Sequence, residues 1–116
     1  MQNQIQNQIA KLSPYKAPGP DGIPNIVLKE CVKLLITPLT NIFNAIIQLN
    51  TYYNPWREFT TIVLRKPFKP SYDLPKAYCP IALISTTAKL LMALIADNLS
   101  TITEHHQLLP TNHFGG

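Results

Sequence analysis

The chain has 116 residues, of which 46% are hydrophobic and only 14% are charged. This length allows no more than one domain, and this composition excludes a disordered acidic or basic tail. The formal net charge of +4 permits an anionic partner but does not require one. Lysine, threonine or proline interrupts each of the longest apolar runs, so we expect no membrane-spanning segment and no membrane partner.

The two cysteines, Cys31 and Cys79, lie far apart and lack the spacing of metal ligands. The sequence also shows no signal peptide. We therefore expect two free thiols, no metal site and a reducing, intracellular compartment. The sequence does not distinguish the cytoplasm from the nucleus.

Helical patterns dominate the first 50 residues. Residues 2–9 repeat the motif QNQI and predict a short, frayed amphipathic helix, with a Gln/Asn-rich interaction segment as the alternative. Residues 13–24 contain four prolines and two glycines, which exclude a helix or a central strand, and we expect residues 16–24 to form an extended, irregular strap. Amphipathic helices are expected to begin at Pro24 and at Pro38, with Thr37 as the cap of the second.

The next stretch predicts a β-hairpin followed by a helix. Residues 59–64 are rich in threonine, isoleucine and valine, which favours a strand, and because both faces are apolar we expect it to be buried. A second strand is expected over residues 81–84, and a helix that backs the hairpin begins near Thr87. The expected apolar face of this helix comprises Ala88, Leu91, Ile95, Leu99 and Ile102. The predicted fold class is α+β, with helices packed on a small antiparallel hairpin.

No catalytic or metal-binding constellation is visible. The six carboxylates are scattered, with no two adjacent or two apart, whereas a two-metal site needs carboxylates clustered around the cations. The histidines do not show the i, i+4 spacing of a helical metal site, and a solvated helix end explains the adjacent pair His105 and His106. We therefore assign no catalytic residue and no metal ligand.

A basic loop between the two predicted strands is the one positive signal. It carries Arg65, Lys66, Lys69 and Lys76, and it also contains the aromatic residues Tyr72 and Tyr78. Such a loop can reach a phosphate chain, and tyrosine rings can stack on a base or a sugar. An ordinary solvated loop explains the same composition, and composition alone favours that interpretation.

Three segments, in order, resemble the amino-terminal part of the reverse transcriptase of non-LTR (LINE-type) retrotransposons. They are KAPGPDGIPNIVLK (16–29); IVLRKPFKP (62–70) with PKAYCPIALIS (75–85) and KLLMALIADNLS (89–100); and LLPTNHFGG (108–116). The resemblance covers nearly all of residues 16–116 and implies a partial reverse transcriptase domain there, preceded by a helical extension over residues 1–15. It also implies a truncated fold, namely the fingers and the start of the palm of an RNA-directed DNA polymerase.

The resemblance also implies roles for single residues. Lys66 matches the fingers lysine that contacts the triphosphate of the incoming nucleotide, and Arg65 and Lys69 lie on either side of it. Cys79 stands where the family motif (tyrosine, arginine, proline) has an arginine that would hold the triphosphate by bidentate hydrogen bonds. A cysteine cannot supply that contact. Nucleotide or template binding is therefore expected at Arg65, Lys66, Lys69 and position 79.

Three further residues depart from the family pattern. Phe68 replaces a usual glycine in the turn of the finger, Met92 replaces a usual glutamate, and His113 replaces a usual glutamine. The sequence also ends before the aspartates of the palm that bind metal in the family.

The parent polymerase would use an RNA template, a DNA primer, deoxynucleoside triphosphates, two Mg²⁺ ions and the missing palm. The chain alone is expected to hold no cofactor and to be inactive as a polymerase. Two alternatives remain, a stand-alone nucleic-acid-binding module without chemistry and the non-functional product of a decayed element.

Overall fold

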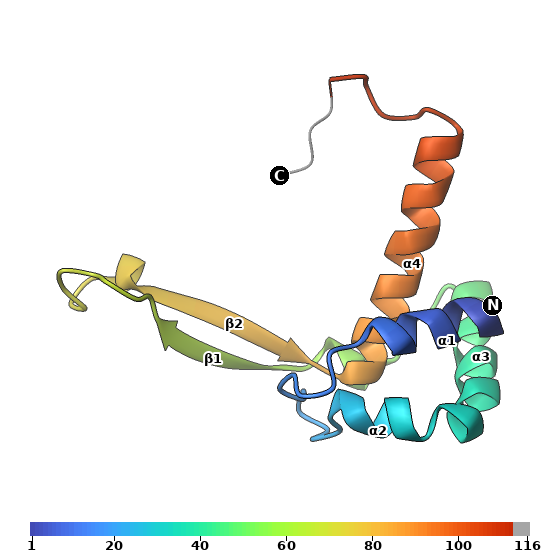
Figure 1. Ribbon diagram of the computed structural model, residues 1–116, viewed down its shortest axis with the longest axis horizontal. Coiled ribbons are helices and arrows are strands. Elements are labelled where there is room, and N and C mark those ends of the chain that lie inside the picture. Colours follow the sequence, from blue (N-terminus) through green and yellow to red (C-terminus); the bar gives the residue numbers. More distant parts are fainter. Residues whose placement is uncertain (113–116) are drawn as a thin grey trace.

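The helices and the strands occupy separate parts of the molecule in the computed structural model, which describes residues 1–112 (Figure 1). In chain order the elements are α1 (Gln2–Lys11), α2 (Asn25–Glu30), α3 (Val32–Gln48), the 3₁₀ turn η1 (Asn54–Arg57), β1 (Phe59–Arg65), the 3₁₀ turn η2 (Pro75–Ala77), β2 (Tyr78–Ile84) and α4 (Thr86–His105). This mixture of helices with one antiparallel strand pair confirms the α+β composition. None of the helices within the described residues combines the length and apolar character needed to cross a membrane.

The helices form one body whose centre is α1, which packs against α2, α3 and α4. The side chains of Ile5 and Ile9 on α1 are 0% and 2% exposed. The expectation of a frayed amino-terminal helix is therefore wrong, because these two isoleucines exclude water from the centre of the body. The buried apolar cluster comprises Ile5, Ile9, Leu28, Leu39, Phe43, Leu90, Leu91 and Leu94.

Helix α3 continues through Pro38, so the expectation that a helix begins there with Thr37 as its cap is wrong. The break lies earlier, at Cys31, which separates α2 from α3. Proline costs a helix interior one backbone hydrogen bond, here the one that the carbonyl of Leu34 would accept. Leu34 is 79% exposed, so water reaches this region, while Leu39 and Phe43 continue the buried stripe beyond the proline. The burial of Leu39 and Phe43 therefore outweighs the cost of the hydrogen bond lost at Pro38.

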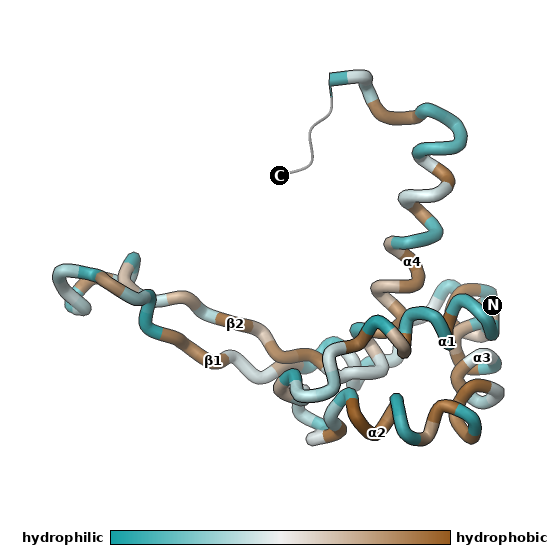
Figure 2. The backbone as a smooth tube through the Cα atoms, viewed as in Figure 1, coloured by the Kyte–Doolittle hydropathy of each residue, from teal (hydrophilic) through white to brown (hydrophobic). Residues whose placement is uncertain are grey.

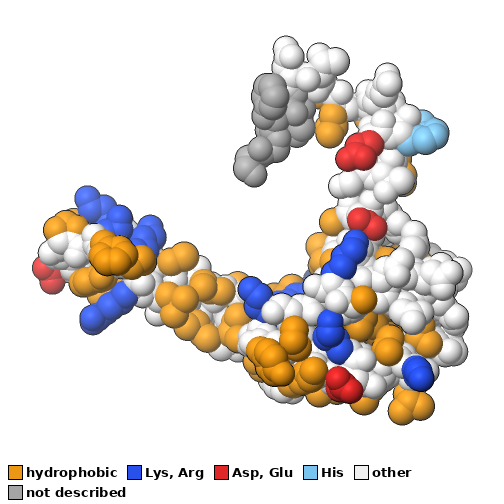
Figure 3. Space-filling view, in the orientation of Figure 1, with side chains coloured by type: hydrophobic (Ala, Val, Ile, Leu, Met, Phe, Trp, Pro, Cys, Tyr) orange, Lys and Arg blue, Asp and Glu red, His pale blue; other side chains and the backbone are white. Residues whose placement is uncertain are grey.

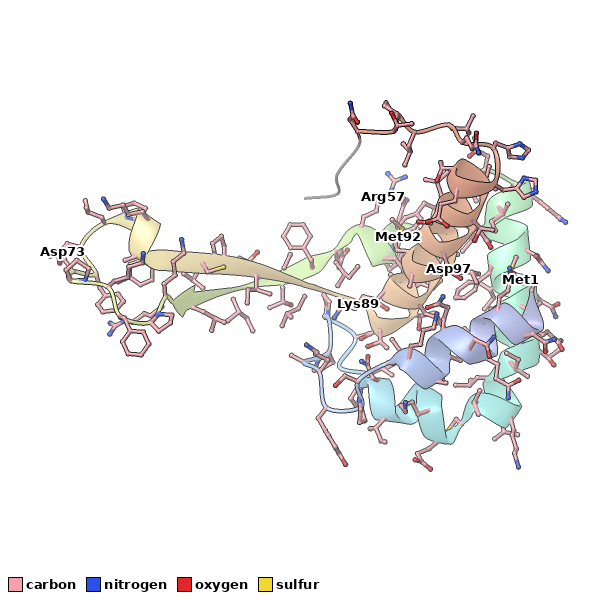
Figure 4. The ribbon with its side chains drawn as sticks, turned by 45° about the horizontal axis from the view of Figure 1, so that its top comes forward. Met1, Arg57, Asp73, Lys89, Met92 and Asp97 are labelled. Carbon is pink, nitrogen blue, oxygen red and sulfur yellow. The ribbon has the colours of Figure 1, made fainter. Side chains whose placement is uncertain are left out.

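The hairpin projects away from the helical body (Figures 1 and 4). Its strands are antiparallel, with Phe59 opposite Ile84 at the base and Arg65 opposite Tyr78 near the tip. Every residue of β1 is exposed, so the expected burial of this strand is wrong. The reason is that the helices pack on one another rather than on either face of the hairpin. Figure 2 shows that hydrophobic residues nevertheless continue along both strands.

Helix α4 begins at Thr86, one residue before the expected start, with Ser85 as its N-cap residue. Only its first half lies in the core, where Thr86, Ala88, Leu90, Leu91 and Leu94 are buried. The second half extends away from α1 and α2 (Figure 1). The predicted apolar face is therefore only partly buried, because Ile95, Leu99 and Ile102 remain 39%, 59% and 51% exposed.

The proline-rich strap (residues 13–24) connects α1 to α2 and passes against the base of the hairpin, and its irregular backbone confirms the prediction. Gly22 has a φ of +70°, and its N–H donates to the carbonyl of Gly19 at 3.0 Å. The hydroxyl of the fully buried Thr86 donates to the carbonyl of Ile23 at 2.8 Å. The amide of Asn25 donates to the carbonyl of Ser13 at 2.6 Å. The first bond closes a turn inside the strap, the Thr86 bond ties the strap to the start of α4, and the Asn25 bond ties it to α2.

Candidate functional site at the tip of the hairpin

Three lysines meet at the hairpin tip (residues 66–77). Lys66, Lys69 and Lys76 line a pocket of about 460 Å³ whose other walls are Pro70, Ser71, Leu74 and Ala77. Lys66 is half-buried, and the other two lysines are exposed. Figure 3 shows the cationic side chains gathered at this end of the hairpin. The structure thus places two of the expected binding residues, Lys66 and Lys69, at one pocket.

Lys76 completes this group, although it is not among the binding residues expected from the sequence. Its position depends on the short turn η2, which returns the chain from the tip to the start of β2. The signal in the sequence was Pro75, because proline favours the first position of a helical turn. Without the turn, the spacing between Lys69 and Lys76 gives no indication that they share a pocket.

Hydrogen bonds hold the backbone of the tip in place. The N–H of Lys66 donates to the carbonyl of Ala77 at 2.8 Å, and the hydroxyl of Tyr72 donates to the carbonyl of Lys66 at 2.9 Å. The hydroxyl of Tyr78 donates in turn to the carbonyl of Tyr72 at 2.8 Å. Both backbone polar groups of Lys66 are therefore engaged, which fixes the point from which its side chain extends.

Arg65 belongs to a different cluster from the lysines. Its guanidinium carbon lies 5.1 Å from the centroid of the Tyr72 ring, within the range of a cation–π contact. The Tyr72 and Tyr78 rings meet edge to face with centroids 6.1 Å apart. Successive residues of a strand point to opposite faces, so Arg65 and Lys66 lie on different sides of the hairpin. The structure therefore separates Arg65 from the lysine pocket.

Cys79 lies within β2, opposite Leu64, and its side chain is exposed. It does not line the lysine pocket. The hydrogen-bonded pair Lys66 and Ala77 continues the register one residue beyond the strands and lies two residues from the pair Leu64–Cys79. Cys79 and Lys66 are therefore diagonal neighbours on one face. A longer side chain at position 79 could therefore extend toward Lys66, whereas the thiol cannot.

Phe68 occupies the turn with a φ of +58°, and its side chain is fully exposed. Residues other than glycine rarely adopt this left-handed conformation, because the Cβ atom approaches the backbone. This explains why glycine suits the position in the pattern described above. The phenylalanine gains no packing in exchange for the strained backbone.

The carboxylates within residues 1–112 are dispersed rather than clustered. Among residues 1–112, no three histidine, cysteine, aspartate or glutamate side chains lie close enough to share a metal ion. Figure 4 shows Asp73 at the hairpin tip and Asp97 on α4, at opposite ends of the molecule. Asp73 accepts a hydrogen bond from the hydroxyl of Ser71 at 2.6 Å, which gives it a local role in the tip. His113, the last of the expected departures, lies outside the described residues.

Known proteins with sequences similar to this chain are RNA-directed DNA polymerases of transposons and mobile elements. The probable RNA-directed DNA polymerases from transposon BS and transposon X-element of Drosophila melanogaster are 34% and 33% identical to it over 112 residues. The RNA-directed DNA polymerase from the mobile element jockey of the same fly is 28% identical over 112 residues. The chain is related to the reverse transcriptases of non-LTR retrotransposons. This finding confirms the resemblance seen in the sequence motifs.

The relationship extends along almost the whole chain but covers a small part of each reverse transcriptase. The alignments include 97% of this chain and 12% of the length of each relative. No family model matches the chain. The chain therefore aligns with one segment of each of these relatives.

Proposed function

We propose that residues 16–116 correspond to the fingers and the start of the palm of a retrotransposon reverse transcriptase, and that the hairpin tip holds the triphosphate of the incoming nucleotide. The observation that carries this proposal is the pocket shared by Lys66, Lys69 and Lys76 at the end of a projecting hairpin. Ammonium groups bind phosphate oxygens as point charges, and three of them match a polyanionic ligand. Neither Arg65 nor Cys79 lines this pocket: Arg65 lies on the opposite face of the hairpin, and Cys79 lies on the face of Lys66.

The proposal assigns the polymerase chemistry to the longer parent protein. Template, primer, deoxynucleoside triphosphates and Mg²⁺ are the substrates and cofactor of that protein. The described carboxylates do not fit a two-metal site, which needs clustered oxygen ligands. We therefore expect purified chain to give no primer extension on an RNA template with Mg²⁺ and all four deoxynucleotides. Clear incorporation would contradict this part of the proposal.

Titration with a fluorescent nucleoside triphosphate tests the binding site. Lys66→Ala should weaken binding by about tenfold or more, because a charge-assisted hydrogen bond contributes roughly 1.5–3 kcal/mol and 1.4 kcal/mol is a factor of ten. Lys33→Ala removes the same charge from α3, far from the tip, and is the matched control. Equal affinities for the two variants would contradict the proposal.

A second candidate is a nucleic-acid-binding module that needs no chemistry, favoured by the cluster of Arg65, Tyr72 and Tyr78 on the other face. A guanidinium with neighbouring aromatic rings is typical of surfaces on which bases stack. Salt-dependent binding of an RNA–DNA hybrid that is weakened by Arg65→Gln, but not by Lys66→Ala, would favour this module over triphosphate binding.

A further inference from the structure

The two outer edges of the hairpin differ in their hydrogen-bonding groups. The N–H of Lys66 donates to Ala77, so the register makes Leu64–Cys79 and Ile62–Ile81 hydrogen-bonded pairs. The residues between them direct their N–H and C=O groups outward. On β1 the outward residues are Phe59, Thr61, Val63 and Arg65; on β2 they are Tyr78, Pro80, Ala82 and Ile84.

The outer edge of β2 is blocked at two points. Pro80 has no N–H, so a strand added there would leave an acceptor unpaired in the middle of the edge. At the hairpin base, Gly19 of the strap lies against the backbone of Ile84 and Ser85. Proline at an edge and a covering segment are two devices that prevent strand addition in natural proteins.

The outer edge of β1 has neither device. All four outward residues have both a backbone N–H that can donate and a C=O that can accept. No charged side chain occurs between Phe59 and Leu64. Every residue of the strand is exposed, and no other strand among the described residues pairs with it. From Phe59 to Leu64 the edge is thus complete and uncharged, and an edge of this kind is a template for another strand.

We propose that the free edge of β1 pairs with β1 of a second copy of this chain, which gives a four-stranded antiparallel sheet. Pairing centred on Ile62 places Thr61 opposite Val63 and Phe59 opposite Arg65, so no like charges meet. The arrangement is two-fold symmetric, as in most dimers. It also places the lysine-rich tips at opposite ends of the new sheet. Association stops at two copies because Pro80 blocks the remaining edges.

Sedimentation equilibrium of the full chain, from low micromolar to near-millimolar concentration, tests the proposal. The chain should approach the mass of a dimer. Val63→Pro removes one outward N–H and leaves the bonds inside the hairpin, so it should raise the dimer dissociation constant by about tenfold or more. Val63→Thr keeps the N–H and is the matched control. A monomer at every concentration, or equal dissociation constants for the two variants, would overturn the proposal.

Two further measurements separate edge pairing from loss of folding. Amide exchange at Thr61 and Val63 should slow as the concentration rises, while exchange at Ile62, whose N–H is already bonded inside the hairpin, should stay unchanged. Pro80→Val restores the missing donor and should extend association beyond two copies. Assemblies larger than dimers in the unsubstituted chain, or no growth with Pro80→Val, would count against the assigned edge.

Discussion

Gly19 lies so close to the backbone of Ile84 that a Cβ atom at residue 19 would overlap it. This contact joins the proline-rich strap to the point where β2 ends and α4 begins, so it determines how the hairpin leaves the helical body. The strap therefore packs tightly against the junction of β2 and α4, and glycine is required at residue 19 by a close approach of two backbones rather than by a turn.

Gly19→Ala should lower the free energy of unfolding by roughly 1–3 kcal/mol, the usual cost of overpacking against groups that cannot move. Urea denaturation followed by circular dichroism measures this change. Gly22→Asn is the matched control, because nothing lies within 4 Å of the Cβ position at residue 22 and asparagine tolerates the positive φ there. An unchanged midpoint for Gly19→Ala would show that the strap can move away from β2.

Phe68→Gly should stabilise the tip by about 1 kcal/mol, since it relieves a left-handed backbone at φ +58° and removes a fully exposed ring. The readout is exchange of the Lys66 N–H, which is bonded to the carbonyl of Ala77 and should become slower. Phe68→Ala removes the ring but keeps the strain, so it should show little change. Faster exchange in Phe68→Gly would mean that the chain entropy of glycine outweighs the relief of strain.

The outer half of α4 should behave as an exposed apolar surface, because Ile95, Leu99 and Ile102 remain partly exposed among residues 1–112. Ile46, Ile47, Ile95, Leu99 and Ile102 line a groove of about 480 Å³ between the end of α3 and α4. We expect a dye that reports exposed apolar surface to bind the purified chain, and Leu99→Gln to reduce binding with little change in stability. Leu94→Ala, in the core, should instead cost about 2–5 kcal/mol. A sharp cooperative melt without dye binding would contradict this expectation.

Local chemistry made some features predictable. Pro24 and Thr87 predicted the starts of α2 and α4 within a residue, and the β-branched run beginning at Phe59 predicted β1. Pro38 wrongly predicted a helix start, because the burial of Leu39 and Phe43 outweighs the preference of proline for the first position of a helix. Such an outcome depends on which helices meet, and spacing along the chain does not contain that information.

The candidate site was predictable to a similar extent. Lys66 and Lys69 lie together because only two residues separate them in a tight loop. The position of Lys76 depends instead on the turn η2. The separation of Arg65 from Lys66 follows from strand alternation and could have been foreseen. The exposure of the hairpin could not have been foreseen, because an apolar sequence predicts a strand but does not show whether another element covers it.

Position 79 gives the sharpest test of the triphosphate proposal. Cys79 is exposed and shares a face with Lys66, one diagonal step from it across the hairpin. Cys79→Arg should strengthen binding of a fluorescent triphosphate, because a guanidinium can reach along this face toward the lysine pocket. A charge-assisted contact of roughly 1.5–3 kcal/mol corresponds to one or two decades in affinity.

The matched control for Cys79→Arg is Ala82→Arg, which adds the same charge to β2 on the opposite face and farther from the tip. If position 79 faces the phosphates, only Cys79→Arg should improve binding, and the gain should fade as salt is added. Equal gains from both variants would show a general effect of net charge. No gain from Cys79→Arg, with Lys66→Ala still weakening binding, would place the triphosphate at the three lysines and away from β2.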